Sequence, residues 1–214
     1  MATGLIGILA LAGLLDAGPG IVNFDSAPPG LAPPNWSVGS GSAGYRPWLV
    51  RSDSSAPSRG NVLESSARGE DSPVAVFDSV ICRDGELSVK FRIDPKAVGG
   101  SAGIVWRYRD DKNYYLLDFD ATHKTIGLFR VLDGVRRPVP DRTGKPKIVK
   151  HDIRAGEWHL AKVTFRGTGI KVSFGNRRLF EANDEALPGA GKTGVVTGGA
   201  TIAAFDDFRI EKKS

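Results

Sequence analysis

Short apolar runs of four to nine residues, separated by glycine, proline, asparagine or aspartate, follow one another along the chain from residue 21 onward. Runs of this length with such boundaries are typical of β-strands. No stretch sustains the 3.6-residue periodicity of an amphipathic helix. The pattern therefore predicts fifteen strands, at residues 21–25, 36–39, 48–52, 61–65, 74–77, 86–93, 102–109, 114–119, 125–132, 135–139, 158–165, 170–174, 177–181, 193–197 and 203–211.

The alternation within these runs predicts an all-β fold, a two-sheet antiparallel sandwich over residues 21–214. In the segment 86–93, ELSVKFRI, every second side chain is apolar, so one strand face lies in the core and the other in water. In the segment 158–165, WHLAKVTF, we assign Ala161, Val163 and Phe165 to the core. This parity places His159 on the core side near the start of its strand.

The stretch 103–119, GIVWRYRDDKNYYLLDF, predicts a hairpin with a charged turn between two apolar strands. Strict alternation sends one set of its side chains into the core and leaves Arg107, Tyr114 and Asp118 on the open face. The inward set consists of Ala102, Ile104, Trp106, Tyr108, Tyr115, Leu117 and Phe119. The Asp133-Gly134 pair further along predicts a type I′ turn.

Composition excludes several classes of protein. The chain has 214 residues, of which 41% are hydrophobic and 25% charged, as in ordinary globular proteins and unlike disordered or membrane-inserted chains. The net charge is +5, but the basic clusters 136–137, 145–150 and 177–178 are short and fall in predicted turns. They indicate a solvated surface rather than a nucleic-acid site. The single cysteine, Cys82, excludes an internal disulfide, and we expect it in the core.

The N-terminal segment Leu5–Leu15, LIGILALAGLL, is apolar but too short to span a bilayer. Together with Ala10-x-Ala12 it is similar to a secretory signal, although it lacks the preceding Lys or Arg. We therefore expect residues 1–20 to be a signal-like segment and the protein to be secreted or periplasmic. The alternative is an ordered N-terminal strand or helix.

The order of eight segments along the chain resembles a known family. The segments are FDS.PPG..P..W, W.V..D..APS..NVL, F.DGELSVKFR, GIVWRYRD.KNYYLLDFD, LFRV.DG.RR, EWHLAKVTFRG..IKVSFG...LFEA.D, PGAGKTGVVT and FDDFRIE. They resemble the 3-keto-disaccharide hydrolase family and, more broadly, the concanavalin A-like (laminin G-like) lectin and glucanase jelly rolls. The resemblance spans residues 23–211. It implies two curved antiparallel sheets and a carbohydrate ligand at one sheet or its rim.

Two catalytic chemistries have different requirements here. A retaining glucanase needs a closely spaced pair of acidic side chains, and no strand shows that motif. A 3-keto glycoside has an acidic C2 proton, so one base and one cation near the carbonyl suffice for its cleavage. The candidate bases are Asp118 and His159, and the candidate cations are Lys90, Arg92 and Arg107.

A binding site needs an aromatic face beside charged groups that hydrogen-bond hydroxyls. We predict that outward-facing Arg107, Tyr114 and Asp118 converge with Lys90 and Arg92. The hairpin aromatics Trp106 and Tyr115 complete the set of candidate substrate-binding residues. The alternative is a cross-strand ladder of ion pairs on an exposed sheet.

A calcium ion is the one metal that the sequence suggests. If the first and last strands are neighbours, Asp25 meets Asp206 or Asp207 and supplies oxygen ligands. The alternative roles are solubilising a sheet edge or capping a turn. Three functions thus stay open: a glycan-binding module, an enzyme acting on 3-keto glycosides, and a structural or adhesion domain.

Overall fold

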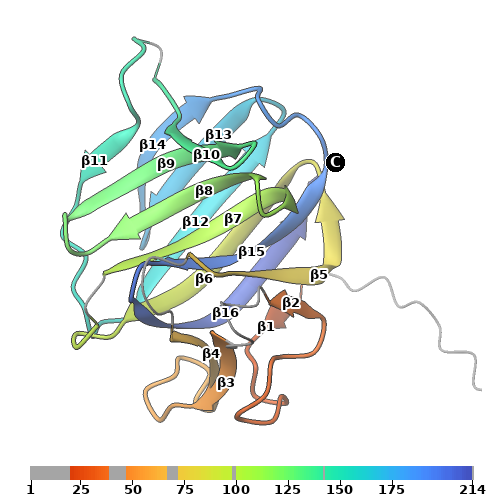
Figure 1. Cartoon of the computed structure of the whole chain (residues 1–214), viewed down its shortest axis with the longest axis vertical. Coiled ribbons are helices and arrows are strands. Elements are labelled where there is room, and N and C mark those ends of the chain that lie inside the picture. Colours follow the sequence, from red (N-terminus) through yellow and green to blue (C-terminus); the bar gives the residue numbers. More distant parts are fainter. Residues whose placement is uncertain (1–19, 39–46, 67–71, 98–99, 142, 214) are drawn as a thin grey trace, which may run out of the picture.

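The computed structural model describes residues 20–38, 47–66, 72–97, 100–141 and 143–213. These residues form two antiparallel β-sheets packed face to face (Figure 1). The signal-like segment Leu5–Leu15 lies outside the described residues. Within the described ranges no helix is long and apolar enough to cross a membrane.

Sheet A has eight strands, and the order of its main path is β14-β13-β12-β6-β16-β4-β3, with β1 paired to β16. The sheet joins strands from both ends of the chain, so its centre consists of segments far apart in sequence. Its strands are β1 (Ile21–Val22), β3 (Trp48–Ser52), β4 (Asn61–Ser66), β6 (Gly85–Ile93), β12 (His159–Arg166), β13 (Gly169–Phe174), β14 (Arg177–Asn183) and β16 (Ile202–Lys212).

Sheet B also has eight strands, in the order β10-β9-β8-β7-β15-β5-β2, with β11 paired to β9. Four consecutive strands, β7 to β10, form a meander of antiparallel neighbours. The strands are β2 (Trp36–Val38), β5 (Val74–Cys82), β7 (Ser101–Asp110), β8 (Asn113–Asp120), β9 (Thr125–Leu132), β10 (Val135–Pro138), β11 (Ile148–Lys150) and β15 (Gly191–Gly198).

All fifteen predicted strands are confirmed, with ends that differ by a few residues. The sequence pattern missed β11, which is only three residues long and lies in a basic segment without alternation. The turn between β9 and β10 is confirmed as type I′, because Asp133 and Gly134 have φ angles of 50° and 81°. The first strand does lie beside the last, the condition for the calcium site considered above, since Val22 lies opposite Phe208.

The core lies between the sheets and follows the predicted alternation. On β6 and β12 the side chains assigned to the interior are buried, and His159 faces the same side, against the ring of Phe91. Cys82 is buried in this core as expected. On β7 and β8 the inward set is confirmed with one exception, which concerns Arg107 and Tyr108.

A β-bulge reverses the two residues that follow Trp106. The register of β7 shifts between Trp106 and Asp110, and Arg107 adopts the left-handed conformation with φ 48°. The predicted outward position of Arg107 is therefore wrong, because the bulge turns this side chain inward and puts Tyr108 outside. Gly191 on the neighbouring strand permits this arrangement, since a Cβ there would overlap the backbone of Arg107.

The buried guanidinium of Arg107 joins three turns at one end of the sandwich. It donates hydrogen bonds to the backbone oxygens of Arg83 at 3.0 Å, Leu187 at 2.9 Å and Gly167 at 2.6 Å. Asp84 lies 3.4 Å away as its ion-pair partner. A buried guanidinium needs acceptors for its N–H groups, and these turns supply them, so this arginine has a structural role.

Candidate ligand-binding face

The predicted convergence of five polar residues on one surface is wrong. Lys90 and Arg92 lie on β6 in sheet A, whereas Tyr114 and Asp118 lie on β8 in sheet B. The outer faces of the two sheets point in opposite directions, so these side chains cannot contact one ligand. Alternation correctly identified which side chains point away from the core, but it carries no information about which sheet holds each strand.

On sheet A the outward charges form the ion-pair ladder that was the alternative interpretation. Lys90 pairs with Asp207 at 2.8 Å, and Arg92 pairs with Asp53 at 2.6 Å. The guanidinium of Arg92 also lies over the ring of Trp158. Each cation that was a binding candidate here already has a carboxylate partner.

Three of the candidate binding residues are inaccessible. Trp106 and Tyr115 are fully buried and stack on each other, with ring centroids 5.4 Å apart, and Arg107 is 1% exposed. The Tyr115 hydroxyl donates a hydrogen bond of 2.6 Å to Asp184. Burial and this carboxylate raise the pKa of Tyr115 well above its ordinary range. These side chains shape the interior and present no surface to a ligand.

His159 and Asp118 do not lie together in one catalytic site. The ring of His159 lies on the inner side of sheet A, stacked on Phe174, and its Nε2 lies 2.8 Å from the backbone oxygen of Arg154. Asp118 lies on the outer side of sheet B. The sandwich core separates the two groups.

The three aspartates proposed for calcium have other partners. Asp25 accepts hydrogen bonds from Ser58 and Asn61, and Asp206 accepts one from the Ser58 backbone, so both hold the loop before β4. Burial raises the pKa of Asp206 above its usual value. Asp207 turns to Lys90. Within the described ranges no three His, Cys, Asp or Glu side chains gather closely enough to hold a metal ion, so these carboxylates do not form one ligand set.

The polar group that the structure does assemble lies on the outer face of sheet B, which we call face B. Asp118 is 9% exposed, and its two oxygens accept hydrogen bonds from Ser101 and, at 2.6 Å, from Arg136. Arg136 extends over the Phe129 ring, with its Cζ 3.8 Å from the ring centroid, and reaches Asp118 from there. These groups border a cavity of about 180 Å3.

An apolar floor surrounds this polar group. Tyr114 and Leu116 on β8 are only 8% and 4% exposed although they face away from the core. They pack with side chains from four neighbouring strands, namely Val76, Val105, Val131 and Val196, with Val74, Tyr108 and Phe129 at the margin. Gly103 lies beneath Leu116, and a Cβ there would approach Leu116 Cδ1 to 2.9 Å. Face B is therefore smooth and closely packed.

Two tyrosines give face B its aromatic character. The rings of Tyr108 and Tyr114 lie with centroids 5.5 Å apart, and burial raises the pKa of both hydroxyl groups. Both hydroxyls therefore stay protonated at neutral pH and can donate hydrogen bonds. Sequence reasoning named Tyr114 and Asp118 but missed Ser101, Tyr108 and Arg136. The available signal was the consecutive apolar residues of β7 and β8, which indicate strands buried on both faces.

Comparison with known proteins defines the fold class. No protein-family model matches this chain, and no curated protein sequence does either. Among solved structures, the carbohydrate-binding module CBM66 from Bacillus subtilis superposes with a TM-score of 0.66 at 17% identity, over 86% of this chain and 98% of the module. The β-glucanase of Bacillus licheniformis gives 0.59 at 13% identity, over 94% and 100% of the two chains. The Crh5 transglycosylase gives 0.62 at 14% identity, over 92% and 85%.

These likenesses, together with the two-sheet topology, show a concanavalin A-like jelly-roll β-sandwich, as the sequence resemblance implied. At such identities the likeness concerns the fold alone. The narrower resemblance, to the 3-keto-disaccharide hydrolase family, is not part of what these structures show.

Proposed function

We propose that the protein is a carbohydrate-binding domain and that face B is its binding surface. The observation that carries this proposal is the Ser101–Asp118–Arg136 group beside Tyr114, at the border of a cavity on an outward face. Hydroxyl-rich ligands need charged hydrogen-bonding groups next to an apolar surface that covers their C–H groups. The names of the similar structures, a carbohydrate-binding module and two enzymes of glycan chemistry, support the same ligand class.

The arrangement favours binding over paired-carboxylate hydrolysis. Two carboxylates border the cavity, but Asp111 lies in the turn before β8 and Asp118 lies near the far end of that strand. Five residues of extended strand from Asn113 to Asp118 span about 16 Å. Glycosidases need their two carboxyl groups within about 10 Å of each other. Both oxygens of Asp118 are also already hydrogen-bonded, so this carboxylate is suited to orienting a ligand.

The second candidate is cleavage of 3-keto glycosides, the activity implied by the sequence resemblance. The observation in its favour is that the carboxylate of Asp118 lies beside the guanidinium of Arg136. One base and one cation are the minimum that proton abstraction next to a ketone requires. His159 has no part in this candidate, because it lies within the other sheet.

Affinity electrophoresis in gels containing β-glucan, xylan, mannan or dextran tests the binding proposal. We expect retardation by at least one polysaccharide and a loss of at least about tenfold in affinity for Asp118→Asn and Arg136→Met, because hydrogen bonds to charged groups contribute about 1.5–3 kcal/mol. Glu86→Gln removes a matched charge from the sheet A ladder and should bind normally. Release of the aglycone from a 3-keto glucoside, abolished in Asp118→Asn, would replace the binding proposal with the second candidate.

A further inference from the structure

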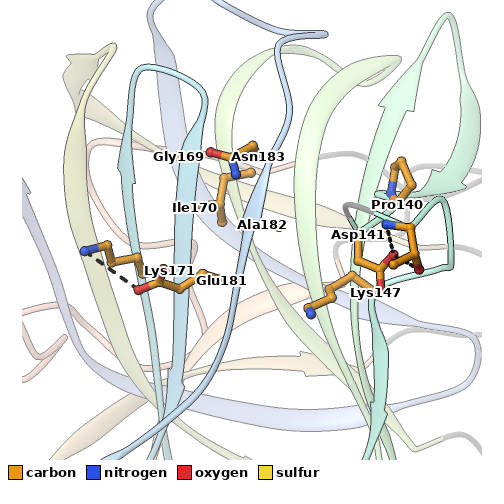
Figure 2. A pocket seen from close by; sticks show the side chains of 10 residues that line it. Pro140, Asp141, Lys147, Gly169, Ile170, Lys171, Glu181, Ala182 and Asn183 are labelled. Atoms are coloured by element: carbon orange, nitrogen blue, oxygen red, sulfur yellow. Dashed lines mark hydrogen bonds and ion pairs between the residues drawn. The ribbon is translucent and has the colours of Figure 1, made fainter.

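A larger cavity lies away from face B, where the edges of the two sheets approach each other. Its volume is about 780 Å3, within the range of ligand sites. One wall is the loop that joins β10 to β11, with Pro140, Asp141 and Lys147, and the other is the β13–β14 pair (Figure 2). We call this cavity the edge cleft.

The carboxylates of the edge cleft have closer partners within the protein than its lysines have. Asp141 accepts hydrogen bonds from the backbone and hydroxyl of Thr143 and from the Lys145 backbone, so its carboxylate shapes its own loop. These hydrogen bonds lower the pKa of Asp141. Glu181 lies 2.6 Å from Arg178, a shorter ion pair than the 3.8 Å to Lys171. Both carboxylates therefore have close partners inside the protein.

The lysines have weaker partners. The Lys147 ammonium lies 5.4 Å from the centroid of the Phe180 ring on β14, so it spans the edge cleft. Among the described residues no carboxylate lies within 4.0 Å of it, although its charge helps to lower the pKa of Asp141 across the cleft. The flanking residues Lys145, Arg177 and Arg178 add three positive charges to a lining in which two lysines match two carboxylates. The fold thus concentrates basic clusters that are separate in the sequence.

We propose that the edge cleft is a second binding site and that it takes a saccharide bearing carboxylates, such as a uronate oligomer, with Lys147 as its main cation. The saccharide part of this proposal rests on the function proposed above, and the anionic part rests on the charges of the cleft. Pro140 offers apolar surface to sugar C–H groups, beside the nearly buried Ile170 and Ala182, and the Asn183 side chain offers an amide to hydroxyl groups.

Two other anionic partners fit the lining less well. Among the described residues that line the edge cleft, none is an aromatic on which a nucleic-acid base could stack. A peptide strand added to the free edge of β14 would meet the charged side chains of Arg177, Arg178 and Glu181, and charged edge strands oppose such pairing.

Isothermal titration with tetragalacturonate, and with the same oligomer after its carboxylates are reduced to alcohols, tests the site. We expect the acidic oligomer to bind more tightly than the reduced one. Lys147→Gln should weaken it about fivefold and Lys171→Gln about twofold, as exposed ion pairs contribute at most about 1 kcal/mol. Lys96→Gln, an exposed lysine elsewhere, is the matched control, and Asp118→Asn should leave this binding unchanged.

Four results would overturn the proposal: equal affinity for the reduced oligomer, equal loss in Lys147→Gln and Lys96→Gln, loss in Asp118→Asn, or equally tight binding of polyglutamate. Its failure can be told apart from failure of the face B proposal. Neutral polysaccharide binding that depends on Asp118, without binding of tetragalacturonate, removes only the second site. Binding of tetragalacturonate that depends on Lys147, without neutral binding, removes only the first.

Discussion

The outer faces of the two sheets both point away from the core but differ in chemistry. On sheet A the outward side chains of β6 are Glu86, Ser88, Lys90 and Arg92, and the charged ones pair with residues of neighbouring strands or, for Arg92, of the loop after β3. On sheet B the outward side chains of β8 are Tyr114, Leu116 and Asp118, all nearly buried. The sheet A face therefore maintains solubility and strand pairing, whereas face B offers a packed apolar surface with one polar group.

The difference shows that charged residues on an exposed strand face can be explained without a ligand. Apolar residues on such a face require a further explanation. Ion pairs between neighbouring strands satisfy one another and stay hydrated. Apolar side chains from several strands on an outward face are uncommon in globular proteins and fit the binding surface that we propose. Mutations that affect one face and not the other are the direct test of this contrast.

The largest effect is expected for Arg107, because the bulge that buries it also places Tyr108 on face B. Arg107→Met keeps an apolar stem but removes the donor to the backbone oxygens of three turns, of which that of Leu187 is buried. We expect the free energy of unfolding, measured by urea denaturation, to fall by about 3–5 kcal/mol. Loss of ligand binding should accompany it, since face B depends on this register.

Arg109→Met, two residues along on the exposed part of β7, is the control and should change stability by less than about 0.5 kcal/mol. If Arg107→Met does not fold, Arg107→Lys should show a smaller loss, because an ammonium can donate to some of the same oxygens. Equal stability of Arg107→Met and Arg109→Met would show that the guanidinium does not hold the turns.

The same substitution on the two faces measures how tightly each is packed. Leu116→Ala on face B removes a side chain that is 4% exposed, and we expect a loss of about 2–3 kcal/mol in the free energy of unfolding. Leu160→Ala on β12 removes a partly exposed leucine of sheet A and should cost about 1 kcal/mol or less. Similar losses in the two variants would mean that face B is not a packed surface.

The sequence sufficed for the strands and the inward side chains because both depend on local alternation, which a single strand displays by itself. The site depended on two things that alternation does not contain. One is the sheet to which each strand belongs, which separated Lys90 from Asp118. The other is the bulge at Arg107, which needs Gly191 on a strand some eighty residues later. Arg136 was missed for the first reason, since its contact with Asp118 crosses β9.

The smallest effect concerns an ion pair on sheet A and depends on pH. Burial raises the pKa of Asp53, but hydrogen bonds from Ser55 and the charge of Arg92 lower it further, so the net pKa lies below its usual value. The side chain of an aspartate in the unfolded chain has a pKa of about 3.9. The ionised carboxylate therefore stabilises the folded protein above about pH 4, and this contribution is lost as the pH falls through the lowered pKa. Asp53→Asn should lower the free energy of unfolding by about 1 kcal/mol at about pH 6 and by almost nothing at about pH 2.5, measured by urea denaturation at both pH values. Asp133→Asn, at a turn position without an ion pair among the described residues, is the control, and because Asn-Gly also suits a type I′ turn it should change the free energy of unfolding little at either pH. If the loss of stability in Asp53→Asn is independent of pH, the hydrogen bonds with Ser55, which an asparagine can retain in part, matter more than the charge of Asp53. The ion pairs of sheet A would then add little electrostatic stability.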